Sequence, residues 1–354
     1  MSLFDDMLKG EESLFLDTIA LDVDFMPGVV KHRENEQQYI ATCIKPLFQK
    51  RSGKNLFITG SPGIGKTVAV KHVLQELKKE TGDIETIYVN CWKKDTAHKI
   101  ALEICDQLDY KFVHNKDTTD LFRDITKILN KRAAVIVLDE VDKVAGDEVF
   151  YTLIEDLYRK SIILITNEKE WLGKIDSRVR SRLMVDVLEF RAYSHEEVAD
   201  ILRERVNYAF VPGVFQEDGF SLIAQKTFEK GDLRVGLFFL REAGELAEST
   251  SSRRITVEHA RKVLAKLKEF SIKKVESLAP EERKMLEMIS HHIGKTTKQI
   301  FDLYVKDEKI SYSSFQRRLK QLAKGKFITL QPANTGQPGN VMMVQKGNMT
   351  LDEF

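Results

Sequence analysis

The sequence predicts a three-part chain: an α/β domain built on a parallel β-sheet, an all-helical domain, and a small domain of three helices and two strands. Three observations predict this. Up to residue 190, short apolar runs alternate with helix-length segments, as in βαβ units. Between residues 191 and 275, only helical spacing is found. From Pro280, which suits the first position of a helix, a new pattern begins and ends in two strand-like runs. The expected domains are therefore 1–190, 191–275 and 276–354.

Strands of the first domain are expected at four short runs, of which Ala133–Leu138 is continuously apolar and therefore suits a parallel strand that is buried on both faces. These runs are Asn55–Thr59, Thr86–Asn90, Ala133–Leu138 and Ser161–Thr166. The segments between them place apolar residues at helical spacing. The expected helices are Lys66–Lys79, Thr96–Leu108, Thr119–Asn130 and Val149–Tyr158.

The two later domains are predicted in the same way. Four helices are expected in the second domain, at Glu196–Ala209, Gly219–Lys230, Val235–Thr250 and Val257–Phe270. The third domain is expected to contain helices Pro280–His291, Thr297–Val305 and Ser313–Ala323, then strands Phe327–Leu330 and Val341–Val344. Three helices followed by a two-stranded sheet are the layout of a winged helix-turn-helix.

Composition excludes several classes of protein. The 354 residues carry 55 Lys and Arg against 54 Asp and Glu, and 42% of them are hydrophobic. This is a globular profile, and its balanced charge excludes a chain that binds nucleic acid over its whole surface. The three scattered cysteines, Cys43, Cys91 and Cys105, predict neither a disulfide framework nor a cysteine metal site. No apolar run reaches the ~20 residues of a membrane span, and the start lacks a secretory leader, so we expect a cytoplasmic protein with no membrane partner.

The sharpest motif lies between the first predicted strand and the first predicted helix. Gly60-Ser61-Pro62-Gly63-Ile64-Gly65-Lys66-Thr67 matches the P-loop, whose glycines let backbone N–H groups converge on phosphate oxygens. Lys66 would reach the β- and γ-phosphates, and the Thr67 hydroxyl would bind Mg²⁺. With the adjoining Val68, these residues predict a site for ATP or ADP. The strand–loop–helix context disfavours the alternative, a chance glycine turn.

Polar side chains end two other predicted strands. Asp139 and Glu140 follow a buried apolar run. Asp139 would hold Mg²⁺ together with Thr67, and Glu140 would orient the attacking water. Asn167 follows the next strand, at the carboxyl edge where α/β sheets bind ligands, and would help to position that water. Helix capping by the two carboxylates and a simple turn at Asn167 are the structural alternatives.

A run of alternating arginines follows at residues 177–182. In a helix, Arg178 and Arg182 share one face. Either could act as an arginine finger on the nucleotide of a neighbouring copy. By spacing alone, a solvated basic face is an equally good interpretation.

Together these motifs resemble those of AAA+ ATPases. Their order is similar to that of archaeal initiators, the origin-recognition and helicase-loader proteins related to the origin recognition complex. The resemblance extends over essentially the whole chain. It includes stretches within 3–15 and 26–34, Asn90-Cys91, Tyr193-Ser194 with Ile201–Arg205, and Gly231-Asp232-Leu233-Arg234.

The resemblance implies nucleotide contacts by His32, Arg33, Tyr193, Arg205 and Arg234. The first two would lie near the adenine, the next two would reach in from a helical lid domain, and the last would sense the γ-phosphate. It implies that Arg182, ahead of Arg178, is the finger. It places a DNA-contacting initiator motif near 118–130. The implied partners are double-stranded DNA at a replication origin, the replicative minichromosome maintenance helicase, and other copies or paralogues.

The third domain is locally basic, with twelve Lys and Arg against eight Asp and Glu in Pro280–Phe354. In its third helix, Phe315, Leu319 and Leu322 form the buried stripe. Residues on the other faces would enter the major groove, namely Ser314, Arg317, Arg318, Lys320 and Gln321. Lys324 and Lys326 would add phosphate contacts, and the polar wing tip at 334–340 would suit the minor groove. Protein binding is the alternative use of such a domain.

These inferences favour an ATP-dependent, nucleoid-associated initiator of DNA replication whose slow ATP hydrolysis acts as a switch. An ATP-regulated winged-helix transcription factor is the alternative, because it would share the same parts. A clamp-loader subunit is disfavoured, since such subunits end in a helical collar.

Overall fold

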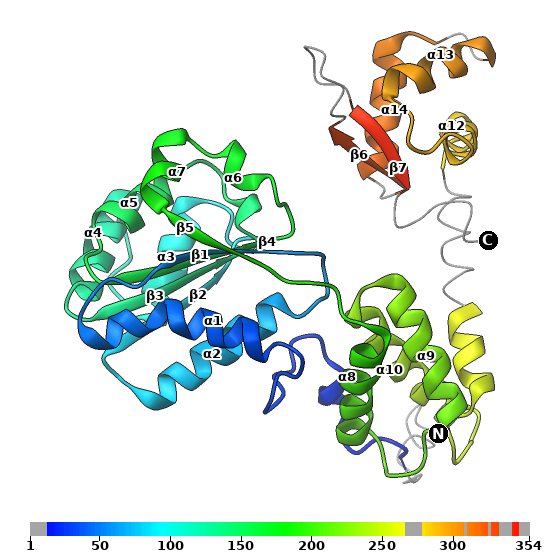
Figure 1. The fold of residues 1–354 in the computed structure, drawn as a ribbon, viewed down its shortest axis with the longest axis horizontal. Coiled ribbons are helices and arrows are strands. Elements are labelled where there is room, and N and C mark those ends of the chain that lie inside the picture. Colours follow the sequence, from blue (N-terminus) through cyan, green and yellow to red (C-terminus); the bar gives the residue numbers. More distant parts are fainter. Residues whose placement is uncertain (1–12, 266–277, 308–309, 325–326, 333–341, 347–354) are drawn as a thin grey trace, which may run out of the picture. The chain divides into compact units, whose positions relative to one another are not determined.

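The computed structural model describes residues 13–265, 278–307, 310–324, 327–332 and 342–346. The chain divides into two compact units, residues 1–260 and 261–354 (Figure 1). The first unit contains the predicted sheet domain and most of the predicted helical domain. Among the described residues, no helix has the length and apolar character that crossing a membrane requires.

The first unit is built on a five-stranded, all-parallel sheet. In spatial order its strands are β2 (Ile84–Asn90), β3 (Ala133–Asp139), β4 (Lys160–Thr166), β1 (Asn55–Thr59) and β5 (Val185–Glu189). The four predicted strands are confirmed. The fifth was missed because it lies at the sheet edge, where Val187 is exposed and polar residues interrupt the apolar pattern.

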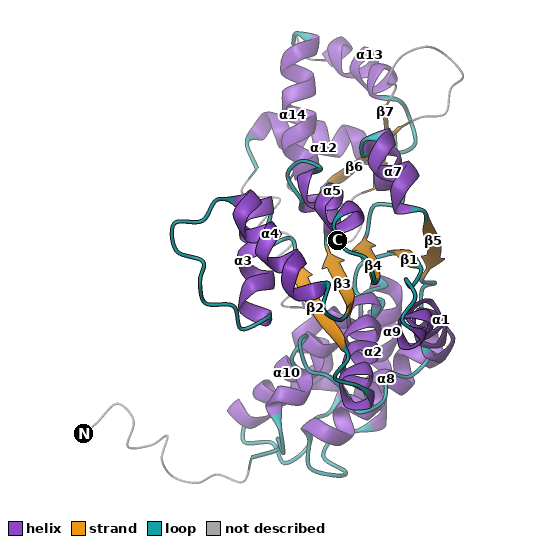
Figure 2. Ribbon diagram, turned by 90° about the vertical axis from the view of Figure 1, so that its left-hand side faces the viewer, coloured by secondary structure: helices purple, strands orange, loops and turns teal. Residues whose placement is uncertain are grey.

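Helices cover both faces of the sheet (Figures 1 and 2). On one face lie α1 (Glu34–Ile44) and α2 (Lys66–Glu80); on the other lie α3 (Ala97–Gln107), α4 (Thr118–Leu129), α5 (Glu148–Glu155) and α7 (Ser177–Leu183). The short helices are η2 (Lys45–Gln49), η3 (Val141–Lys143) and α6 (Trp171–Lys174). Alternate strand residues such as Ile136, Leu138 and Leu164 pack with Ile100 and Ile125 into one buried core.

Strand register brings three polar positions to the same edge of the sheet. Asn90 at the end of β2 is aligned with Asp139 at the end of β3, and Asp139 is aligned with Ile165 of β4. Asn167 follows β4 directly, and the P-loop follows the neighbouring strand β1. The sheet therefore gathers the predicted nucleotide-site residues at its carboxyl edge.

The helical part of the first unit contains α8 (His195–Ala209), α9 (Glu217–Lys230), α10 (Leu233–Ser249) and the start of a helix over residues 257–265. Helix α8 begins with a capping box between Ser194 and Glu197. The N-terminal segment, with η1 (Thr18–Leu21), packs against these helices. Its Leu16 N–H donates to Ala209 O at 2.8 Å, and the rings of Phe15 and Phe210 lie 4.7 Å apart.

The second unit contains α12 (Pro280–Ser290), α13 (Thr297–Asp307) and α14 (Tyr312–Lys324). Strand β6 (Ile328–Pro332) pairs antiparallel with β7 (Met342–Lys346). A core of Leu286, Ile300, Phe315, Leu319 and Val344 joins the helices to the strands. These elements agree with the prediction to within a few residues. The predicted wing tip at 334–340 and Lys326 lie outside the described residues.

Candidate nucleotide-binding site

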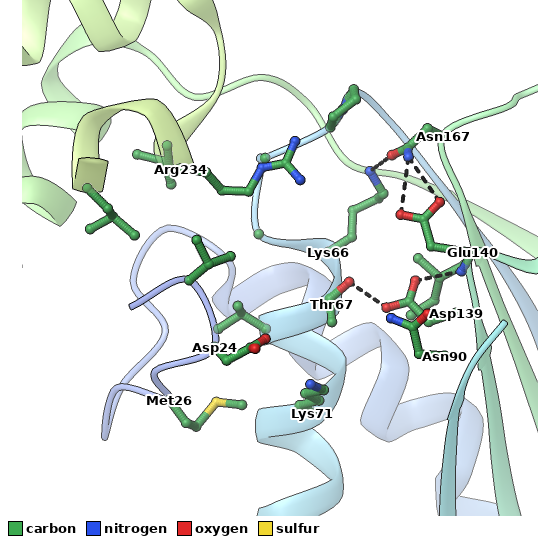
Figure 3. A pocket seen from close by; sticks show the side chains of 18 of the residues that line it. Asp24, Met26, Lys66, Thr67, Lys71, Asn90, Asp139, Glu140, Asn167 and Arg234 are labelled. Atoms are coloured by element: carbon green, nitrogen blue, oxygen red, sulfur yellow. Dashed lines mark hydrogen bonds between the residues drawn. The ribbon is translucent and has the colours of Figure 1, made fainter. Parts of the chain in front are cut away.

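A cavity of about 390 Å³ lies at the carboxyl edge of the sheet, between the P-loop and helices α8 and α10 (Figure 3). The P-loop, the ends of β2, β3 and β4, and the start of α10 all contribute lining residues. Its volume is within the range of small-molecule sites. Several of the predicted site residues line it, namely Pro62, Gly63, Gly65, Lys66, Thr67, Val68, Asp139, Glu140, Asn167, Arg205 and Arg234.

The P-loop requires glycine at two positions in particular. Gly63 and Gly65 have left-handed backbone conformations, with φ of 71° and 85°. A Cβ atom added at Gly65 would lie 2.6 Å from the Tyr193 hydroxyl oxygen. Gly65 is also the N-cap of α2, so the unpaired N–H groups of the first helical turn face the cavity. This geometry favours an anion such as a phosphate.

Lys66 holds its ammonium group at the centre of the site. Its Nζ donates to Gly60 O, Ser61 O and Asn167 Oδ1, each at 2.7 Å. Burial lowers the pKa of Lys66 to about 8, although the nearby carboxylates of Asp139 and Glu140 favour the charged form. The side chain therefore remains a cation near neutral pH, within reach of an anion in the cavity.

Asp139 is buried and receives three hydrogen bonds. Its Oδ2 accepts from the hydroxyls of Thr67 and Tyr88, both at 2.7 Å, and its Oδ1 accepts from the Glu140 N–H at 2.9 Å. A hydroxyl beside a carboxylate suits Mg²⁺, which prefers oxygen ligands and takes several of them from phosphates and water. Among the described residues, no group of three or more His, Cys, Asp or Glu could hold a metal. With two oxygen ligands side by side, the pair Thr67 and Asp139 fits an ion whose remaining ligands come from a nucleotide and water.

Glu140 is held in a strained conformation between charged neighbours. Its backbone is left-handed, with φ 54° and ψ 44°, which is rare for a residue other than glycine. Burial, followed by the charges of Asp139 and Asp142, raises the pKa of the Glu140 carboxyl. The Asn167 amide nitrogen lies 3.4 and 3.5 Å from its two oxygens. Asn167 thus bridges Lys66 and Glu140, as Figure 3 shows.

Known proteins identify the family. A model of an AAA domain matches residues 49–169, and a model of the Cdc6 AAA+ ATPase-type lid domain matches residues 199–265. The ORC1-type DNA replication protein 1 of Sulfurisphaera tokodaii is 30% identical over 99% of this chain and 94% of the relative. This chain belongs to the ORC1-type DNA replication protein family. It is therefore an AAA+ ATPase by family, and its helices α8 to α10 belong to a Cdc6-type lid.

Solved structures agree with the ORC1-type fold. The Aeropyrum pernix ORC1 protein, solved in complex with DNA, matches 96% of this chain and 95% of its own at 24% identity, with a TM-score of 0.70. The ADP form of the Aeropyrum pernix ORC2 protein matches 96% of both chains at 19% identity, with a TM-score of 0.68. At these identities the likeness shows the fold alone.

Six residues expected at the nucleotide do not line the cavity of this ORC1-type chain. Three belong to the P-loop itself, Gly60, Ser61 and Ile64, and the others are His32, Arg33 and Tyr193. Arg33 is completely buried behind the P-loop, where its guanidinium donates to Ile64 O and Arg191 O and lies 3.9 Å from the Tyr193 ring centre. His32 Nε2 lies 2.8 Å from Asp200 Oδ2 of α8. This geometry does not support the expected adenine contact of Arg33, because its guanidinium is occupied by the protein.

The other residues expected from the lid do line the cavity. Arg234 lies at the start of α10 and points toward the P-loop (Figure 3). Arg205 of α8 is mostly buried; its guanidinium donates to Ala20 O and Phe25 O and stacks on the Phe25 ring at 4.6 Å. Arg205 therefore also fixes the N-terminal segment that forms one wall of the cavity.

The arginines expected to serve a neighbouring copy are exposed on α7 and do not line this chain's own cavity. Arg178 pairs with Asp176 at 3.4 Å, and Arg182 pairs with Glu155 of α5. The segment is helical in α7, so the two arginines are one turn apart. Their role as fingers stays a prediction.

Sequence reasoning missed several lining residues, including Asp24, Met26, Lys71, Tyr88 and Asn90. Asn90 ends β2 just as Asp139 ends β3, so the rule that pointed to Asn167 would have found it. Tyr88 carried no such signal, because only the register of β2 against β3 places its hydroxyl beside Asp139. Burial raises the pKa of Tyr88, which keeps that hydroxyl protonated as a donor.

In the second unit, α14 presents the residues predicted to read DNA. Arg317, Lys320 and Gln321 are exposed around a shallow hollow. Ser314 is half-buried and accepts a hydrogen bond from the Ser311 hydroxyl at 3.0 Å. Arg318 is also half-buried and lies 3.9 Å from Glu281 of α12. Arg317, Lys320 and Gln321 therefore form the open part of the predicted surface.

Proposed function

We propose that this chain is an ATP-dependent initiator of DNA replication, which binds origin DNA and helps to recruit the replicative minichromosome maintenance helicase. One observation carries the ATPase part of the proposal. Lys66, Asn167 and Glu140 form a continuous chain of polar contacts beside the paired Thr67 and Asp139. Membership of the ORC1-type family supports the replication role.

The chain's own residues would divide the chemistry of ATP hydrolysis among them. Mg²⁺ held at Thr67 and Asp139 would neutralise phosphate charge. Lys66 and the N–H groups of the P-loop bind the phosphates. Glu140 orients a water molecule and accepts its proton, a task that its raised pKa suits. Asn167 fixes Glu140 relative to Lys66. We expect slow, switch-type turnover, with Arg182 or Arg178 acting on a neighbouring copy or paralogue.

The second unit supplies the proposed DNA contacts. Its three helices and antiparallel strand pair fit a winged helix-turn-helix in which α14 is the recognition helix. Exposed Arg317 and Gln321 have the donor groups that read guanine and adenine edges in the major groove. The Aeropyrum pernix ORC1 protein, which shares this fold, was solved in complex with DNA. DNA binding would make the chain nucleoid-associated.

Binding and turnover assays on purified variants test this proposal. Lys66→Ala should abolish ATP binding and leave weak DNA affinity. Arg317→Ala should weaken binding to duplex DNA by about tenfold, because a base-contacting arginine contributes ~1–3 kcal/mol, and should leave ATP binding intact. Lys79→Ala removes an exposed charge at the other end of α2 and is the matched control. Full-strength ATP binding by Lys66→Ala would refute the assigned site.

A further inference from the structure

Asp232, the residue immediately before α10, lies directly against the P-loop. Its backbone neighbour Leu233 donates its N–H to Gly63 O at 3.2 Å. A side chain at Gly63 would overlap the Asp232 carboxylate. An acidic side chain thus lies beside the loop that is built to receive phosphate, where its charge would repel a polyphosphate.

The same carboxylate holds Arg234. The arginine Nε lies 2.9 Å from Asp232 Oδ1 and 3.1 Å from Oδ2, and its Nη2 lies 2.5 Å from Oδ2. One edge of the guanidinium is therefore engaged by a carboxylate in a forked arrangement, and a phosphate would use the same edge. Burial works to raise the pKa of Asp232, but the hydrogen bonds from Arg234, together with the positive charges of Arg234 and Lys66, outweigh it and hold that pKa below its usual range. The carboxylate is therefore ionised at neutral pH.

We propose that Asp232 is a competing anion: it holds Arg234 until the terminal phosphate of ATP replaces it, and so sets how strongly the chain discriminates ATP from ADP. This inference rests on the proposed ATP binding. The exchange couples the nucleotide to the lid, because Asp232 caps α10 by accepting from the Arg234 N–H at 3.0 Å. Release of the arginine side chain leaves this cap in place, so the lid helix stays formed while its arginine changes partner.

Asp232→Asn tests the exchange, because asparagine caps helices as well as aspartate but carries no charge. ATP and ADP affinities are measured by titration calorimetry on the full chain. We expect ATP to bind about tenfold more tightly than to wild type, since the lost pairing is a charge-assisted one, and ADP affinity to change less than about threefold. Asp232→Ser, another capping residue, should give the same result. In an Arg234→Ala background, Asp232→Asn should no longer favour ATP over ADP.

The control is Asp218→Asn, which removes a charge from the first turn of the neighbouring lid helix α9 and should leave both affinities unchanged. An unchanged or weaker ATP affinity in Asp232→Asn, with normal wild-type binding, would overturn the exchange and make Asp232 a positioning residue for Arg234. A wild-type chain that binds no ATP would refute the proposed function itself, and the inference with it.

Discussion

Arg33 could have either of two roles: it could support the P-loop from behind, or it could contact a bound nucleotide. Its side chain is completely buried, and its guanidinium donates to Ile64 O at 3.0 and 3.2 Å, to Arg191 O at 2.7 Å and to the Glu36 carboxylate at 2.7 Å. The first acceptor belongs to the P-loop, and the second to the segment that leads into the lid. Arg33 therefore holds the P-loop in place from behind. A side chain that only contacted the nucleotide would contribute little to the stability of the nucleotide-free chain.

Arg33→Met keeps most of the aliphatic volume and removes every hydrogen bond of the guanidinium. It leaves the Glu36 carboxylate without its partner, and breaking a buried ion pair costs about 3–5 kcal/mol. In a domain of this size, such a loss of stability lowers the midpoint temperature of thermal unfolding by roughly 10 °C. Thermal unfolding without nucleotide measures it. Arg132→Met is the control, because its pair with Glu85 is half-exposed and should contribute less than about 1 kcal/mol. If Arg33→Met left the unfolding midpoint unchanged but lost ATP affinity, Arg33 would not support the P-loop and would instead contact the nucleotide.

Three further outcomes are expected. Because burial lowers the pKa of Lys66 to about 8, ATP affinity measured by calorimetry should fall roughly tenfold from pH 7 to pH 9 as the amine loses its proton; Lys66→Arg should show no such fall. Glu140→Gln should bind ATP normally but release phosphate at least about 100-fold more slowly, and wild-type release rates would exclude it as the base. Gly244→Ala should lower the free energy of unfolding by about 1–3 kcal/mol, since its Cβ would overlap the Phe15 ring, whereas Gly173→Ala, with open space around it, should not.

The sequence was informative where structure is determined locally. Strands β1, β3 and β4 are buried almost throughout and form largely apolar runs, and the P-loop glycines are required by backbone conformation. Strand β5 is stabilised by pairing with β1 at the sheet edge rather than by burial, so its sequence carries no such run. Its existence depends on a partner more than a hundred residues away.

The site was predictable for the same reason, but only in part. Asp139 and Asn167 follow strands, and parallel strands end at one edge, so their meeting could be predicted. The position of Arg33 depends on the path of the N-terminal segment behind the P-loop, which no local pattern specifies. The pairing of Arg234 with Asp232 is close in sequence, yet its significance depends on Gly63, which belongs to another element.

Genome-wide chromatin mapping of the protein tests the central claim most directly. An initiator of DNA replication should occupy one or a few origin-proximal repeats, and the exposed face of α14 should be required for that occupancy. Binding dispersed over many promoters would contradict the claim and would favour the ATP-regulated transcription factor instead.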